Sequence, residues 1–421
     1  MKYKTYNCNS FNIYTIKTDR FKTSHMEVIF RNVLNKEEIG KYSFLADMLS
    51  ESCKKYPKKK DLITRFEELY KTVIYASTVR VGNVIDLHVS LDFINPDYID
   101  DKNYVEEVIK TLFELIDNPN VVNDEFDLKT FNIVKERLRR EINSLKENPV
   151  KQSIKEAFRE MDKDSSTSYE LLGTTEELDT ITPSNLYEAY KNLRKNFKVD
   201  VFLIGNLDMD ETASLIKKHF KNRYIVDKTY DMMVKNKETK KVHEKSKKSD
   251  NVQTNLVMLF NLCNLTEIEK NITFNVFNYL YGSGGLTSKL YKSIREENSL
   301  CYAINSMYLK YDGLLMVQIS LDQCNVKKAV MLVKKELKNM QNGEFSGLEV
   351  EDAINNMIIS LDMSLDNNIA ILNNYVFNVY DNFPSIEDRR ELFKKIRKED
   401  IVNVSKKIKL NTIFALEGKD K

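Results

Sequence analysis

The chain has 421 residues, which is longer than a domain with a single hydrophobic core usually is. This length suits two domains of about 200 residues each. Its 65 basic and 63 acidic side chains nearly cancel, so no global field favours nucleic acid or an anionic membrane as a partner. The five scattered cysteines form neither a disulfide framework nor a CxxC metal pair, and no long apolar run marks export or membrane insertion, so we expect a cytoplasmic protein.

The first half of the chain predicts strands and helices that are mixed without strict alternation. Strand patterns occur at MEVIF (26–30), VIDLHVSLDF (84–93) and VDVFLIG (199–205). The segment VEEVIKTLFELI (105–116) carries apolar residues at helical spacing. We therefore expect a strand, a helix, two strands joined by a turn, long helices and a last strand.

The second half repeats this order at a constant distance along the chain. LVMLF (256–260) matches MEVIF, and ISLDQCN (319–325) matches VSLDFIN (89–95), each 230 positions later, as in 321 minus 91. A helical pattern at 326–340 and the strand TIFALEG (412–418) complete the repeat. Because chance rarely produces the same offset without gaps over several segments, we infer a duplicated α+β fold. Each of the two homologous domains should hold a mixed, mostly antiparallel sheet with helices packed on one face.

A polar segment separates the two halves. KNKETKKVHEKSKKSD (235–250) is almost entirely polar and rich in lysine, so it cannot bury enough apolar surface to order itself. We therefore predict an N-terminal domain over 1–225, a charged linker over 226–250 and a C-terminal domain over 251–421.

The four histidines, His25, His88, His219 and His243, predict no metal site. No two of them lie three or four residues apart, the spacing that places two imidazoles on one helical face. His243 starts HEKSK, where HExxH would require a histidine in place of Lys247. His88 and His219 lie among apolar neighbours, which is typical of structural histidines.

The glycine-rich segment GSGGLTSK (282–289) is not a phosphate-binding loop. The GxxxxGK[ST] pattern requires glycine before the lysine and serine or threonine after it, but Ser288 and Leu290 occupy those positions. The preceding NITFNVFNYLY is helical rather than a strand, so the expected context is also missing. We predict a close backbone turn before a helix.

A polar corner follows this turn. A helix should end near Glu297 and a strand should start near Leu300, with Arg295 and Tyr302 on either side. Guanidinium and phenol donors together suit a peptide carbonyl or the oxyanion that it becomes. The alternative is a surface arginine beside a half-buried strand tyrosine.

These residues resemble the C-terminal half of the pitrilysin/insulinase family of zinc peptidases. In that family Gly-Gly, Ser-(Lys/Arg)-Leu, Arg-Glu and Leu-x-Tyr recur in order, as in GGLTSKLYKSIREENSLCY (284–302), with seven residues from Arg295 to Tyr302. The resemblance covers nearly the whole chain, because further segments follow in the family's order: 62–91, NP (118–119), ITPSNLYEAYKNL (181–193) and FLIGNLD (202–208).

The zinc motif of this family is missing from the chain. Catalytic members carry HxxEH on the first long helix and a glutamate ligand on a later one. Alignment with that helix places Ser43 and Asp47 at the histidine positions and Ala46 at the general base. Glu141 falls at the third ligand position, although its distance from Asp47 is longer than usual. The resemblance therefore implies no metal or other cofactor in this chain.

The absent motif and the retained Arg295 and Tyr302 are similar to the non-catalytic subunit of the family's heterodimeric bacterial members. By that resemblance, an HxxEH-bearing partner would hold the zinc, both chains would close around a peptide, and Arg295 and Tyr302 would orient its scissile carbonyl. A homodimer of the isolated chain stays open.

Two alternatives to this function remain at the level of the sequence. The chain could be a structural or peptide-binding scaffold without a peptidase partner. It could also be an autonomous hydrolase that uses Asp47, Glu51 and Glu141.

Overall fold

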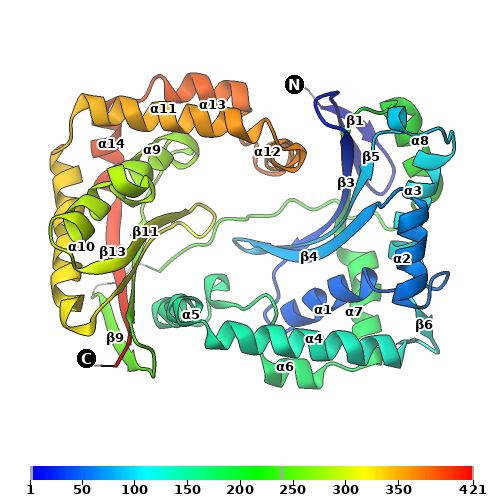
Figure 1. Cartoon of the computed structure of the whole chain (residues 1–421), viewed down its shortest axis with the longest axis horizontal. Helices are drawn as coiled ribbons and strands as arrows, with labels where there is room; N and C mark the ends of the chain where they lie inside the picture. The colour runs from blue at the N-terminus through cyan, green and yellow to red at the C-terminus, as the bar shows by residue number, and fades with distance from the viewer. Residues whose placement is uncertain (1–2, 238, 240, 420–421) are drawn as a thin grey trace. The chain divides into compact units, whose positions relative to one another are not determined.

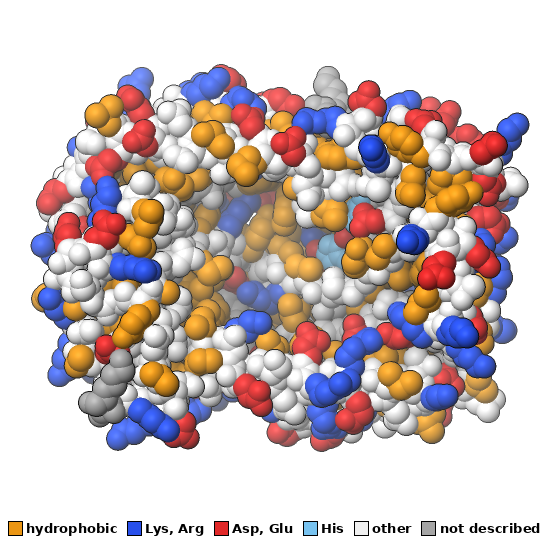
Figure 2. Space-filling model, viewed as in Figure 1, with side chains coloured by type: hydrophobic (Ala, Val, Ile, Leu, Met, Phe, Trp, Pro, Cys, Tyr) orange, Lys and Arg blue, Asp and Glu red, His pale blue; other side chains and the backbone are white. Residues whose placement is uncertain are grey.

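The computed structural model describes residues 3–237, 239 and 241–419. They form two compact units, drawn in Figure 1. The first unit comprises Met1–Asn143, Tyr169–Met232 and Leu365–Phe377, and the second comprises Ser144–Ser168, Met233–Ser364 and Asn378–Lys421. Within the described residues, no helix is both long enough and apolar enough to cross a membrane. Basic and acidic side chains are interspersed on the face seen in Figure 2, in line with the near balance of charge.

The first unit contains a six-stranded sheet in the order β1-β2-β8-β3-β5-β4. Only the β2–β8 pair is parallel, and the other neighbours are antiparallel. Its strands are β1 (Lys4–Asn7), β2 (Asn12–Lys17), β3 (Thr23–Val33), β4 (Val73–Val81), β5 (Val84–Ile94) and β8 (Lys198–Gly205). A two-stranded hairpin of β6 (Val121–Val122) and β7 (Glu125–Phe126) stands apart from it.

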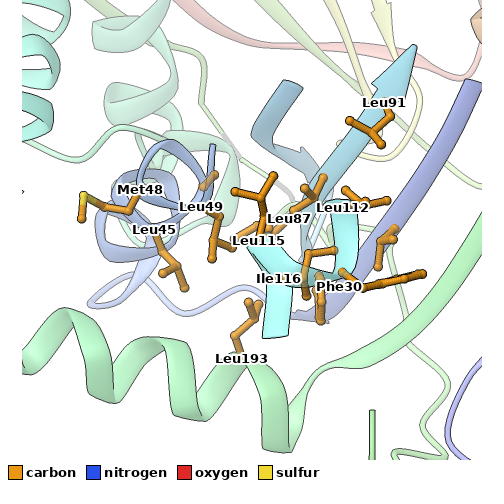
Figure 3. Close-up of a cluster of buried hydrophobic side chains, with 14 of the residues drawn as sticks. Phe30, Leu45, Met48, Leu49, Leu87, Leu91, Leu112, Leu115, Ile116 and Leu193 are labelled. Atoms are coloured by element: carbon orange, nitrogen blue, oxygen red, sulfur yellow. The ribbon is translucent and has the colours of Figure 1, made fainter. Parts of the chain in front are cut away.

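Helices cover one face of this sheet. They are α1 (Ile39–Leu49), α2 (Lys59–Glu68), α3 (Tyr104–Asp117), α4 (Leu128–Glu147), α6 (Thr175–Thr180), α7 (Pro183–Asn196) and α8 (Met209–His219), with a short 3-10 turn at Pro96–Tyr98. The start of α7 is specified locally, because Thr182 caps the Asn185 backbone N–H and Pro183 occupies the first turn. Figure 3 shows part of the core, with Phe30, Leu87 and Leu91 from strands and Leu45, Met48, Leu49, Leu112, Leu115, Ile116 and Leu193 from helices.

The opposite face of β3 and β5 carries buried ion pairs. Alternation along β3 turns Met26, Val28 and Phe30 to the apolar core, and His25, Glu27 and Arg31 to the other side. Arg31 holds Asp86 with two hydrogen bonds, and both side chains are only 3% exposed. His88 Nδ1 lies 2.8 Å from Glu27 Oε1, and His25 Nδ1 lies 2.8 Å from Asp92 Oδ1. Each buried charge on this face therefore has a partner.

The second unit contains a five-stranded sheet in the order β11-β12-β10-β13-β9. Its strands are β9 (His243–Lys248), β10 (Thr254–Leu262), β11 (Cys301–Leu309), β12 (Leu314–Leu321) and β13 (Ile408–Glu417). The α-helices are α5 (Pro149–Asp162), α9 (Phe274–Asn278), α10 (Val326–Asn342), α11 (Gly347–Ser364), α13 (Ile386–Phe393) and α14 (Lys398–Ser405), while α12 (Asn368–Asp381) begins in the first unit. Short π-helical segments occupy Glu269–Thr273, Tyr279–Ser283 and Tyr291–Glu296, and 3-10 turns occupy Ser166–Ser168, Gly285–Thr287 and Gln323–Asn325.

The two sheets share one topology, which confirms the predicted α+β fold with duplicated domains. Strands β2, β8, β3, β5 and β4 correspond in order and direction to β9, β13, β10, β12 and β11. The offset of 230 is not kept in the pairing register, however. Met26 faces Leu91, whereas Leu256 faces Ile319 rather than Leu321. A shift of two residues preserves the face of each side chain, so the apolar pattern alone could not reveal it.

The arrangement differs from the predicted domain ranges at two places. Helix α5 lies within the predicted N-terminal domain, yet its Ala157 and Met161 pack against Val257 and Phe414 of the second sheet. His243–Lys248 lies within the predicted linker, yet it forms strand β9 parallel to β13. All six β9 side chains are exposed, so backbone pairing rather than apolar burial orders this segment.

Candidate functional site

Helix α1 carries the three positions at which the zinc motif is degenerate. Eight of its eleven residues are buried, so any polar side chain on it needs a partner within the protein. The Ser43 hydroxyl donates to the Leu171 carbonyl oxygen at 2.5 Å, and its oxygen lies 2.6 Å from Thr78 Oγ1. Ala46 is 1% exposed and offers no ligand atom. Both positions are therefore ordinary interior positions.

Asp47 and the following Glu51 share one arginine from α4. Arg137 Nη2 lies 3.2 Å from Asp47 Oδ2, and Nη1 donates to Glu51 Oε1 at 2.5 Å. The Glu51 side chain is 9% exposed and that of Arg137 is 41% exposed. A fixed organic cation thus holds both carboxylates.

The electrostatics of this cluster follow from its partial burial. Burial raises the pKa of the Asp47 carboxyl above its ordinary value, although the Arg137 charge acts in the opposite direction. Burial also lowers the pKa of the Arg137 guanidinium, but the bond to Glu51 and the charge of Asp47 outweigh this effect and raise it overall. The arginine therefore keeps its charge beside both carboxylates.

These residues do not fit a zinc ion. Zinc needs three protein ligands, typically histidine nitrogens and a carboxylate, with an open fourth position. Ser43 is committed to a carbonyl, Asp47 to Arg137, and Glu141 lies exposed on α4. Across residues 3–237, 239 and 241–419, no group of three or more histidine, cysteine, aspartate or glutamate side chains could hold a metal ion.

The corner that carries Arg295 and Tyr302 lies in the second unit. Arg295 is in the π-helical segment Tyr291–Glu296, and Tyr302 is the second residue of β11. A close backbone approach precedes them, as the glycine-rich segment predicts. A Cβ added to Gly282 would lie 2.5 Å from Ser306 Oγ, and one added to Gly284 would lie 2.7 Å from the Tyr279 carbonyl oxygen. Glycine at position 282 lets the helix approach β11, and glycine at position 284 lets the chain turn closely over Tyr279.

A β-bulge at Tyr302 brings the two residues together. Cys301 pairs with Leu321 and Ala303 pairs with Ser320, so Tyr302 has no partner in the ladder. Its carbonyl oxygen accepts a hydrogen bond from Arg295 Nη1 at 2.5 Å. The Arg295 guanidinium also lies over the Tyr291 ring, 5.2 Å from its centroid. These two contacts fix the arginine across the bulge.

Both side chains reach solvent, Arg295 with unused donors and Tyr302 with a hydroxyl held only by a long bond. Arg295 is exposed, and the bond to Tyr302 uses one of its five N–H groups. Tyr302 is 48% exposed, and its hydroxyl donates to Asp322 at 3.3 Å, the long end of the range for such bonds. The corner can therefore donate hydrogen bonds to an incoming carbonyl oxygen.

Two features of these sites have weak signals in the sequence. Arg137 lies in the run KERLRRE, where three arginines are equally plausible partners for Asp47. Asp322 directly follows the strand LLMVQISL, but only the hairpin pairing places it beside Tyr302. The bulge has no signal in the residue types that form it.

Comparison with known proteins gives consistent matches. The family model described as the peptidase M16 inactive domain matches residues 180–357. The chain is 27% identical over 412 residues to the probable inactive metalloprotease YmfF of Bacillus subtilis (strain 168), covering 96% of this chain and 95% of that protein.

Solved structures share the fold over the whole chain. A conserved protein from Enterococcus faecalis V583 has a TM-score of 0.94 at 23% identity. A peptidase M16 inactive domain from Pseudomonas fluorescens has a TM-score of 0.81 at 15% identity. In both cases all of this chain and all of the other chain are covered.

Proposed function

We propose that the chain is a member of the pitrilysin/insulinase (M16) peptidase family in its form without the zinc motif, and that it is the non-catalytic, substrate-holding subunit of a heterodimeric zinc peptidase. A partner chain with an HxxEH motif would supply the zinc and the general base. This chain would supply Arg295 and Tyr302 as donors to the scissile carbonyl of a peptide. The observation that carries the proposal is the exposed pair of donors, Arg295 and Tyr302, beside the start of β11, in a chain where Arg137 binds Asp47 of the degenerate motif.

The position of Tyr302 on an edge strand supports this role. β11 is the outermost strand of its sheet in the part of the chain that the structure describes. An extended peptide could add to such an edge through backbone hydrogen bonds. The bulge at Tyr302 interrupts the ladder where Arg295 and the phenol present their donors. A carbonyl of the added peptide would therefore face both donors at one point along the strand.

The expected contribution of the pair can be stated as a rate. Donors aimed at a developing oxyanion each contribute about 10²-fold to 10³-fold in kcat, or about 3 kcal/mol. Tyr302 would exchange its long bond to Asp322 for one to the substrate, and Arg295 would use N–H groups that the Tyr302 carbonyl does not occupy.

Reconstitution tests the proposal. The chain is mixed with the HxxEH-bearing M16 chain of the same organism, and kcat and KM are measured with an internally quenched peptide. Tyr302→Phe and Arg295→Lys should each lower kcat by about 10²-fold, because each removes or misplaces one donor. Size-exclusion chromatography establishes that each variant still joins the complex.

Matched controls remove donors of the same kind elsewhere. Tyr98 is 62% exposed, and Arg140 is exposed on α4, so Tyr98→Phe and Arg140→Lys should leave kcat unchanged. Unaltered kcat in both corner variants would refute the assigned role of the pair.

Affinity purification tests the partner separately. The tagged chain should recover an HxxEH-bearing M16 chain from extract of its own organism. Recovery of other proteins without such a chain would favour a scaffold that never meets a peptidase.

A further inference from the structure

The two sheets differ by one strand, and the difference leaves an open edge on β9. In the first unit, β1 pairs antiparallel with β2 and forms the edge of the sheet. In the second unit, β9 occupies the position of β2, beside β13 as Figure 1 shows. Among the described residues, no strand pairs with the outer edge of β9. The outer edge of β2 is thus paired with a further strand, whereas the equivalent edge of β9 is unpaired among the described residues.

The correspondence between β2 and β9 holds residue by residue. Ile29 faces Asp200, which in turn faces Asn12. Leu259, 230 positions after Ile29, faces Thr412, which in turn faces His243. Asn12–Lys17 therefore corresponds to His243–Lys248 over all six positions. The bond that follows each strand is also the same, Thr18 N–H to the Gly205 carbonyl and Ser249 N–H to the Glu417 carbonyl.

This last bond shows which backbone groups of β9 face outward. Ser249 N–H points to β13, and successive residues of a strand point to alternate sides. The backbone groups of Lys245 and Lys247 therefore face β13, and those of Glu244, Ser246 and Lys248 face the open edge. Their counterparts in β2 are Ile13, Thr15 and Lys17, which pair with or flank β1. A strand added at β9 would find the same row of donors and acceptors.

Charge selects the kind of strand that would add. The segment 235–250 carries seven lysines against three acidic residues, Glu238, Glu244 and Asp250. A hollow of about 420 Å³ at the start of β9 is lined by Lys235, Lys237, Lys241 and His243, with Asp162 as its acidic residue. Lys237, Lys245 and Lys247 are held by Asp162, Glu160 and Glu156 of α5, while Lys241 and Lys248 have no carboxylate partner among the described residues. The field beside the edge is positive.

We propose that the outer edge of β9 binds an extended, acidic polypeptide segment of a partner protein as an antiparallel sixth strand. The backbone row supplies the hydrogen bonds, as β1 does for β2, and the lysines around the edge select acidic side chains. A second copy of this chain is disfavoured as the occupant, because its own β9 would bring a second set of lysines to the edge. This surface lies at the end of the sheet opposite β11, so the proposal does not depend on the function assigned to Arg295 and Tyr302.

Hydrogen exchange on the full chain tests the proposal. The probes are an octapeptide that alternates glutamate and threonine and a counterpart with lysine in place of glutamate. The acidic peptide should slow exchange of the Ser246 and Lys248 amides, and the lysine peptide should not. Ser246→Pro removes one outward N–H and should weaken acidic-peptide binding about tenfold, the equivalent of one net hydrogen bond. Ser246→Thr keeps the N–H and should bind as the wild type does.

A charge variant keeps the test decisive if the proline disturbs β9. Lys241→Glu together with Lys248→Glu leaves every backbone donor in place and should reverse the preference toward the lysine peptide. Three outcomes would overturn the proposal: no protection of the two amides at millimolar acidic peptide, equal binding of both peptides, or protection that grows with protein concentration alone.

Discussion

The two arginines of the candidate sites show how one residue type can close one site and keep another open. Arg137 is bound on two sides by Asp47 and Glu51, so its charge is neutralised within the protein. Arg295 meets a neutral carbonyl and a ring face, so its charge and most of its donors remain available to solvent. Asp47, Glu51 and Arg137 thus form an internal ion-pair cluster, while the corner of Arg295 and Tyr302 keeps the means to bind a ligand.

The largest expected effect comes from opening the Arg137 cluster. Arg137→Ala removes the shared partner of Asp47 and Glu51 and leaves Glu51 with only the Lys59 ammonium at 3.6 Å. Breaking a buried pair costs about 3 to 5 kcal/mol, and the lower end applies because the Arg137 side chain is 41% exposed. Urea titration should show a loss of about 3 kcal/mol in the free energy of unfolding. Arg140→Ala, at an exposed position three residues along, should change it by less than about 0.5 kcal/mol.

A smaller loss is expected from displacing the donor corner. In Gly282→Ala the new methyl would meet Ser306 Oγ, and the helix would have to move away from β11. Overpacking of this kind costs about 1 to 3 kcal/mol. Turnover of the reconstituted complex should fall as well, because Arg295 and Tyr302 would lose their alignment. Unchanged stability and turnover would show that the close approach does not position the corner.

The pH dependence of stability sharpens the comparison, because it isolates the buried ion pair of His88 and Glu27. Burial lowers the pKa of His88, but Glu27 outweighs this and raises it above the ordinary 6.5. Burial raises the pKa of Glu27, but His88 outweighs this and lowers it below the ordinary 4.5.

The sign of the effect follows by linkage. The His88 contribution is complete below pH 6.5 and is lost as pH rises through its folded-state pKa. The Glu27 contribution is present above pH 4.5 and is lost as pH falls through its own folded-state pKa. The free energy of unfolding should therefore decline as pH rises above 6.5. That slope should be smaller in His88→Gln, and an equal slope in the variant would contradict the assignment.

The smallest change in stability is expected at Arg295. Arg295→Ala removes one hydrogen bond at an exposed position, so the free energy of unfolding should fall by no more than about 1 kcal/mol. The same substitution should strongly reduce turnover of the complex. If Arg295→Ala lowered the free energy of unfolding as much as Arg137→Ala, both arginines would have to be assigned a role in stabilising the fold.

Local patterns in the sequence were sufficient for the repeated α+β architecture. Alternation in β3 and β5 and helical spacing in α3 and α10 depend on residues that are neighbours along the chain. The sheet against which α5 packs could not be predicted from such patterns, because the apolar face of an amphipathic helix does not specify which sheet it covers. Strand β9 was missed because its six side chains carry no burial pattern at all.

In the candidate site, too, the features with a local sequence pattern could be predicted and those that depend on packing between helices could not. The seven-residue step from Arg295 to Tyr302 is a local pattern, and the structure brings the two residues into contact. Glu141 was aligned as a residual ligand, but it lies exposed, and Arg137, four residues earlier, contacts Asp47 instead. Such a choice depends on which face of α4 meets α1, and residue spacing within α4 cannot decide it.

Zinc stoichiometry and peptide cleavage, measured together on the isolated chain and on the reconstituted complex, test the central claim most directly. The account predicts no bound zinc and no cleavage for the isolated chain after dialysis against zinc, and about one zinc with chelator-sensitive cleavage for the complex. One equivalent of zinc with chelator-sensitive cleavage by the isolated chain would contradict it.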